Sequence, residues 1–138
     1  MENVAFRLLR YWFEEADLHL GNTHVDEKIN IDFLPSGVYH KEKGLFELSF
    51  VFVAWAAKNT PDNYTVKVKC KAEFQFKEIL DIKDIPPFFY PNSIAILFPY
   101  VRAFVSTLTL QANVQPMLLP TINLSPLQEK LMNNTVVK

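Results

Sequence analysis

A strict alternation of apolar and polar residues between Tyr64 and Ile79 constrains the fold of this chain more than any other feature. Every second position is apolar and the intervening positions are polar, in the two sets Val66, Val68, Cys70, Ala72, Phe74, Phe76 and Lys67, Lys69, Lys71, Glu73, Gln75, Lys77. A period of two places the two sets on opposite faces of a β-strand. We therefore predict a strand with one buried and one solvated face. A basic strip for an acidic partner or nucleic acid is the alternative interpretation of the lysines; we favour the solvated face.

Three further segments in the first half have strand character. The segment Leu45 to Ala57 is apolar on one face at Phe46, Leu48, Phe50 and Phe52, and its other face is also apolar at Val51, Val53 and Trp55. We therefore expect this strand to be covered on both sides. Turn residues at 59–63 predict an antiparallel hairpin with the strand that follows.

Two strands are expected nearer the start of the chain. Ile29, Ile31 and Phe33 begin an alternating strand, and Pro35, Ser36 and Gly37 predict a kink or turn after it. The segment Val4 to Leu20 fits either a strand or a helix, and the neighbouring strands favour a strand.

After residue 85 the apolar spacing becomes helical. Ser93 can cap a helix, Pro99 forces a kink or a late start, and the regular part is expected from Pro99 to Ala112. One apolar stripe of this helix consists of Val101, Phe104, Val105, Leu108 and Ala112, and a second, weaker apolar side consists of Ala103, Thr107 and Leu110. Two apolar sides need two neighbours, and we predict that one of them is another subunit.

A final helix is predicted from a capping box at Ser125 and Gln128, with Pro126 at its first position. Strands followed by helices indicate an α+β fold with an antiparallel sheet. The length of 138 residues suits a single domain over residues 1–138.

Composition argues against several function classes. The 14 basic and 15 acidic residues give a net charge of -1, so nucleic acid is not an expected partner. The glycines are isolated, no second cysteine accompanies Cys70, and the histidines form no ligand motif, so we expect no enzyme, cofactor or metal. The start lacks a signal peptide, and the apolar runs at 50–57 and 94–101 are far shorter than the roughly 20 residues of a membrane span. We expect a cytoplasmic protein.

Two motifs carry a family resemblance. Residues 97–102, LFPYVR, are followed by the proline-bracketed segment 116–124, PMLLPTINL. Together they resemble the SecB protein-export chaperone family, and the spacing of the earlier strands agrees with that family as well. Val101 and Ala103 depart from the alanine and the acidic residue usual at those positions.

The resemblance implies a four-stranded antiparallel sheet with two C-terminal helices packed on one face. It implies dimers that pair again through the first helix, and an ATP-independent holdase that binds unfolded or nascent client polypeptides. The implied client groove is lined by Leu18, Leu20, Val25, Val51, Val53, Trp55, Leu124, Leu127, Leu131 and Met132. Trp55 and Leu131 are the strongest candidates because each is hard to bury fully, whereas Leu124 and Leu127 are better explained as core.

The resemblance also implies docking of a translocase ATPase on acidic residues of the exposed sheet surface. Glu14 occupies a matching position, but Arg10 stands where a second acidic residue is expected. Like charges oppose docking to a basic surface. A specialised SecB-like chaperone for one partner, such as a labile antitoxin, therefore remains open, as does an adaptor or scaffold for one folded partner.

Overall fold

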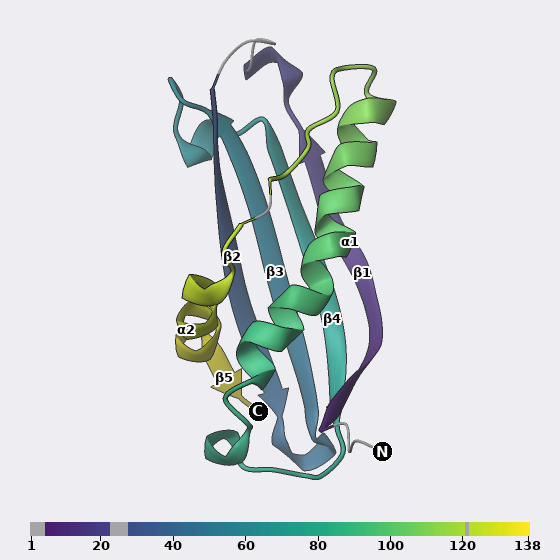
Figure 1. Cartoon of the computed structure of the whole chain (residues 1–138), viewed down its shortest axis with the longest axis vertical. Helices are drawn as coiled ribbons and strands as arrows, with labels where there is room; N and C mark the ends of the chain where they lie inside the picture. Colours follow the sequence, from purple (N-terminus) through teal and green to yellow (C-terminus); the bar gives the residue numbers. More distant parts are fainter. Residues whose placement is uncertain (1–4, 23–27, 121) are drawn as a thin grey trace.

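The structure, a computed structural model, describes residues 5–22, 28–120 and 122–138 of the chain (Figure 1). The strands and helices follow in the order β1 (Phe6–Leu18), β2 (Ile29–His40), β3 (Leu45–Ala56), β4 (Val66–Phe76), α1 (Phe89–Gln111), α2 (Ser125–Asn133) and β5 (Thr135–Val137). Short 3-10 turns lie at Leu20–Asn22, Lys41–Lys43, Pro61–Asn63 and Ile82–Asp84. The predicted α+β fold, with strands before helices, is confirmed.

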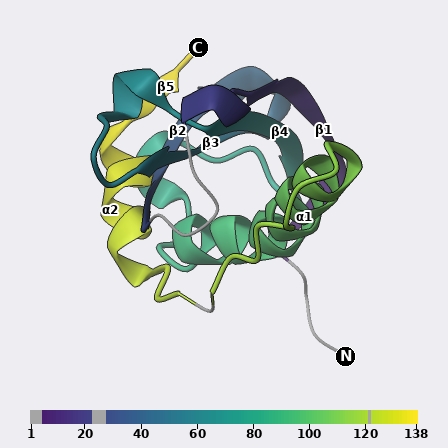
Figure 2. The same cartoon turned by 90° about the horizontal axis from the view of Figure 1, so that it is seen from above.

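The five strands form one sheet in the order β1-β4-β3-β2-β5. The first four pair antiparallel, as predicted, and β5 adds a parallel strand at the edge of β2. Seen from above, both helices lie on the concave side of the sheet (Figure 2). The expected two helices on one face are therefore confirmed, and the four-stranded sheet is extended by a fifth strand.

The alternation in β4 is confirmed residue by residue. Its apolar set faces the helices, and the most exposed member, Phe76, keeps only 3% of its surface. The polar set on the other face is half-buried from Lys67 to Gln75, and Lys77, which follows the strand, is exposed. β4 lies between β1 and β3 in the sheet, so its alternation fixes which face of the whole sheet holds the core.

The predicted turn at Pro35 to Gly37 is wrong, because β2 continues through all three residues. The amide of Gly37 donates to Asn134 of the neighbouring segment, so Gly37 and, by alternation, Pro35 face the outer edge of β2. A proline is tolerated there because it removes no hydrogen bond to β3. A Cβ at Gly37 would lie 2.3 Å from Cζ of Phe46, so the missing side chain makes room for that ring.

Helix α1 begins earlier than predicted and runs without interruption through Pro99. Ser93 is not its cap: the side chain is buried inside the helix and donates a hydrogen bond of 3.0 Å to the carbonyl of Tyr90. Pro99 lies on the exposed side, where water can bind the carbonyl that has lost its partner.

Helix α2 begins at Ser125 as predicted, but its capping differs. No side chain at its N-cap position makes a capping bond, and the amide of Ser125 donates instead to Oδ1 of Asn123 at 3.1 Å. At the other end, Oγ1 of Thr135 donates to the carbonyl of Leu131 at 2.6 Å. This bond joins the last turn of α2 to β5.

Aromatic rings connect the layers of the molecule. Phe89 of α1 lies 4.7 Å from Phe46 of β3, measured between ring centroids. Two stacked pairs fix β1 against α1: Tyr11 on Tyr100 at 4.2 Å, and Phe13 on Phe104 at 3.9 Å. The high aromatic content therefore serves the interior and the junction of β1 with α1.

Candidate polypeptide-binding site

The face of the sheet that the helices leave open carries an apolar patch on β2 and β3. Val51, Val53 and Trp55 alternate with the core residues of β3, so they point away from the helices. Leu34 of β2 lies opposite Val51 and is 49% exposed. We call Leu34, Val51, Val53 and Trp55 the outer apolar patch. Val53 is buried, but Val51 and Trp55 are only half-buried, so the expectation that β3 is covered on both sides is met only in part.

The residues of α2 predicted for the same groove lie on the helix side of the sheet. Leu127 and Leu131 belong to the core, and Leu124 packs against it, while Met132 is 46% exposed. Leu131 has no exposed surface, so the expectation that it is hard to bury is wrong. The reason is β5, which carries the chain onward along β2 and holds the end of α2 against the sheet. The predicted groove is thus divided between two faces.

The predicted crossover residues lie at the end of β1. Leu18 is the last residue of β1 and is half-buried against the core, and Leu20 in the following turn is 40% exposed. Val25 lies outside the described residues. A backbone bond of 2.8 Å from His19 to Thr65 holds this end of β1 next to β4.

The stripe of α1 predicted to meet another subunit faces mostly inward. Val101 and Val105 are fully buried by the chain's own sheet, so their assignment to a subunit interface is wrong. Phe104, Leu108 and Ala112 are half-buried. The open side of α1 instead presents apolar residues that the sequence analysis placed only in part: Ile96, Tyr100 and Leu110, which are 36%, 40% and 56% exposed.

Comparison with known proteins settles the family. The family model described as preprotein translocase subunit SecB matches residues 21–135 of the chain. The chain belongs to the SecB family. The predicted resemblance is therefore confirmed, and family membership supports a chaperone role.

Known structures agree with a SecB-like fold. The SecB-like chaperone Rv1957 of Mycobacterium tuberculosis, in complex with a ChAD peptide from the Rv1956 HigA1 antitoxin, aligns with a TM-score of 0.59 and 20% identity over 86% of this chain and 84% of that chain. A protein of unknown function from Streptococcus agalactiae aligns with a TM-score of 0.40 and 11% identity over 84% of this chain and 97% of that one. The second likeness is too weak to support an argument.

A curated relative matches only in part. The uncharacterized protein MJ0357 of Methanocaldococcus jannaschii is 48% identical over 52 residues, which are 36% of this chain and 34% of that protein. The chain thus matches about a third of that relative's length. The single domain over residues 1–138 stays a prediction.

On the exposed sheet surface, where the SecB resemblance implies translocase docking, charged side chains of β1 form ion pairs with charged side chains of β4. Glu14 lies 3.5 Å from Nζ of Lys69 and 3.7 Å from Nζ of Lys71. Arg10 donates to Glu73 at 2.6 Å, and its guanidinium lies 4.6 Å from the centre of the Trp12 ring. Two lysines of β4, Lys69 and Lys71, are thus matched by a carboxylate of β1, which favours the solvated-face interpretation over a basic strip.

No chemical constellation accompanies the SecB fold in the described residues. Burial raises the pKa of the Cys70 thiol to about 12, which keeps it protonated and unreactive at neutral pH. The described residues hold no group of three or more His, Cys, Asp or Glu side chains that could bind a metal ion. Family membership supports a protein that is not an enzyme.

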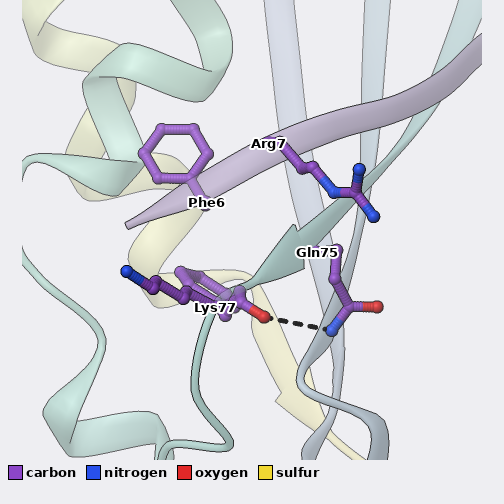
Figure 3. A pocket seen from close by; sticks show the side chains of 5 residues that line it. Phe6, Arg7, Gln75 and Lys77 are labelled. Atoms are coloured by element: carbon purple, nitrogen blue, oxygen red, sulfur yellow. Dashed lines mark hydrogen bonds between the residues drawn. The ribbon is translucent and has the colours of Figure 1, made fainter. Parts of the chain in front are cut away.

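A pocket of about 290 Å³ lies where β1 begins beside the end of β4 (Figure 3). Phe6, Arg7, Gln75, Phe76 and Lys77 line it. The amide of Gln75 donates to carbonyls of Lys43, Gly44 and Phe76, so it holds the adjoining turn in place. This side chain has a structural role and is not poised for chemistry.

Helix α1 is long and apolar enough to cross a membrane, by length and composition alone. No uninterrupted apolar run in the sequence reaches this length, because polar residues such as Asn92 and Arg102 divide the helix. In the structure, α1 lies along the sheet with Ile94, Leu97, Val101 and Val105 fully buried, which is the packing of a core helix.

Proposed function

We propose that this SecB-family protein is an ATP-independent holdase that binds unfolded or nascent polypeptides by their apolar segments. The observation that carries the proposal is the outer apolar patch, which one protomer leaves partly open on a sheet face without helices. Burial of apolar client surface contributes roughly 25 cal/mol per Å² and depends little on sequence. A patch of this kind suits clients that share no sequence.

Exposed apolar residues elsewhere on the chain offer clients further contacts. Leu20 follows the end of β1, and Met132 exposes a flexible thioether on α2, on the helix side of the sheet. The SecB-like chaperone Rv1957, which has this fold, was solved with a peptide bound, so the fold is compatible with a polypeptide ligand.

The test is suppression of aggregation of an unrelated unfolded protein by the full chain. Trp55→Ser and Leu34→Ser should weaken suppression, because each removes apolar area from the outer apolar patch. Ile79→Ser is the matched control: Ile79 is 68% exposed but lies outside the patch, after β4. Leu131→Ser is unsuitable, because this buried residue would report on folding.

The outcomes separate the functions. Suppression that Trp55→Ser weakens and Ile79→Ser does not supports the holdase. No suppression at stoichiometric excess contradicts it and favours an adaptor for one folded partner.

We further propose that the protein acts as a homo-oligomer, either a dimer or a dimer of dimers. β1 is an edge strand with basic residues, Arg7 and Arg10, at its start and acidic residues, Glu14, Glu15 and Asp17, at its end. Two copies of β1 that pair antiparallel would place the basic start of one beside the acidic end of the other. The open side of α1 offers a second apolar contact.

Size-exclusion chromatography with light scattering tests the assembly. Arg7→Glu should weaken it by removing charge complementarity at the start of β1. Lys83→Glu, the same charge change at an exposed position in the Ile82–Asp84 turn, should not. A monomer at micromolar concentration in the unchanged protein would contradict the proposal.

A chaperone dedicated to one partner, such as an antitoxin, is the second candidate. The ion pairs of Glu14 with Lys69 and Lys71 favour it, because they place positive charge beside the acidic residue that an export ATPase would contact. Proteins that co-purify with the chain from its native host distinguish the two. A single stoichiometric partner supports the dedicated chaperone, and a broad set of unfolded proteins supports general holdase or export work.

A further inference from the structure

The attachment of β5 to β2 depends on main-chain atoms. The amide of Gly37 donates to Asn134 at 3.1 Å, that of Lys138 to Tyr39 at 2.8 Å, and that of Lys41 to Lys138 at 3.1 Å. The side chains of β5 contribute little burial, since Val136 and Val137 are 54% and 46% exposed. These bonds flank the parallel pairing of β5 with β2, and many other sequences could make bonds of the same kind, because main-chain groups carry no sequence information.

The preceding part of the same edge is closed to strand addition. Pro35 has no amide hydrogen, and the amide of Phe33 donates to the carboxylate of its neighbour Asp32 at 2.9 Å. Nζ of Lys130 on α2 lies 3.9 Å from that carboxylate, so α2 also passes close to this edge. From Asp32 onward, the stretch of β2 that can accept a strand is therefore Gly37 to His40, and β5 occupies it (Figure 1).

We propose that this stretch of β2 is a strand-addition site for extended polypeptide, and that β5 is a built-in occupant that clients displace. The proposal rests on the proposed holdase function and names a second mode of binding for its clients. The incoming segment is extended and runs parallel to β2. It lacks proline at the positions where β5 donates a main-chain hydrogen bond to β2. The residue beside Gly37 is small or β-branched, because Oγ1 of Thr135 already lies 3.0 Å from the place of a Cβ on Gly37.

A matched pair of proline variants of the full chain tests the proposal. Asn134 and Lys138 bond to β2, so by alternation the amide of Val136 faces β2 and that of Val137 faces away. Val136→Pro releases β5, whereas Val137→Pro leaves its bonds in place. The probe is a synthetic peptide with the sequence of residues 134–138, flanked by solubilising residues.

Val136→Pro should bind this peptide about three- to tenfold more tightly than the unchanged chain, since the competing strand no longer occupies the site. Val137→Pro should bind like the unchanged chain. Equal affinities for all three proteins, with native circular dichroism, would overturn the proposal. If Val136→Pro does not fold, Thr135→Val serves instead, because it removes only the bond to Leu131.

Hydrogen exchange on the unchanged chain gives a second, independent measurement. When an unfolded client binds, the amide of Lys138 should lose protection, while those of Gly37 and Lys41 stay protected by the incoming strand. Unchanged protection of Lys138 in the bound state would overturn the proposal. If the chain suppresses aggregation although the protection of Lys138 is unchanged, the strand-addition proposal fails and the holdase proposal stands. If the unchanged chain does not suppress aggregation, the holdase proposal itself is refuted.

Discussion

At one edge of the sheet, the 13 residues of β1 pair with β4 on one side and have no strand on the outer side among the described residues, whereas at the other edge β2 is flanked by α2 and extended by β5. An unpaired strand is a template for association with other chains, so each edge needs protection. The two edges are protected by different means, and each means selects a different partner.

The β1 edge is protected by charge and by irregular backbone. Its pairing with β4 shifts register between Leu8 and Arg10 and between Phe13 and Glu15, and such bulges twist a strand away from flat pairing. Basic residues at one end and acidic residues at the other match a second copy of β1 better than a strand of arbitrary charge. This arrangement supports the proposed self-association through β1.

The β2 edge is protected by its own chain. Pro35 and the hydrogen bond from the Phe33 amide to Asp32 interrupt the row of free main-chain groups, and β5 covers the stretch after them. Main-chain bonds hold β5 there, and any extended segment can replace those bonds. A charge pattern such as that of β1 selects one complementary partner, whereas a strand held by main-chain bonds can be replaced by many different polypeptides. Self-assembly and client binding can therefore use opposite edges of one sheet.

Leu131→Ala is the change that should break the β2 edge most strongly. Leu131 is fully buried and joins α2 to the core, so its truncation should lower the free energy of unfolding by about 2–5 kcal/mol. Chemical denaturation measures the loss, with Met132→Ala as control, since that exposed side chain should cost less than about 0.5 kcal/mol. Equal losses for both variants would contradict the core role of α2.

Phe104→Ala should weaken the β1 edge by a smaller amount. Phe104 stacks on Phe13 at 3.9 Å but is only half-buried, so we expect a loss of about 1–3 kcal/mol. Denaturation measures stability, and light scattering measures assembly, which should weaken as β1 loosens. Leu110→Ala on the open side of the same helix is the control for stability. A Phe104→Ala protein as stable as this control would show that the stack does not fix β1.

The sequence predicted the buried face of an element correctly where one periodic pattern packs against one layer of the same chain. The alternation at Val66 to Phe76 identified the buried face of the sheet because sheet geometry has a period of two. The patterns predicted wrongly where the result depended on which surface covers an apolar stripe. Val101 and Val105 form an apolar stripe, but a stripe does not say whether the covering surface belongs to the same chain.

Two other misses have local physical causes. Pro35 and Gly37 are turn residues by composition, yet both fit inside β2, one because it faces the edge and the other because Phe46 occupies the space beside it. β5 was missed because three residues carry no measurable period, and its pairing with β2 depends on main-chain bonds. The resemblance predicted one client groove, but its β3 and α2 residues lie on opposite faces of the sheet, which no sequence pattern indicates.

The smallest expected effect concerns the end of β1, where Asp17 meets Tyr64. The hydroxyl of Tyr64 donates to Oδ2 of Asp17, and Nε2 of His19 lies 3.2 Å from Oδ1. The Tyr64 hydrogen bond, assisted by His19, lowers the pKa of the Asp17 carboxyl below its ordinary value. The carboxylate therefore stabilises the folded state above the unfolded pKa of about 3.9, and this contribution is lost as pH falls through the lower folded pKa.

An NMR titration of the Asp17 carboxyl measures this directly. The midpoint should lie below the ordinary value in the unchanged protein and rise toward it in Tyr64→Phe, which keeps the ring and removes only the donor. Asp62→Asn, a charge change in the neighbouring Pro61–Asn63 turn, should leave the midpoint in place. An ordinary midpoint in the unchanged protein would contradict the hydrogen bond. Because Asp17 is exposed, the bond fixes where β1 ends more than it stabilises the fold, and assembly through β1 should change little between pH 5 and 8.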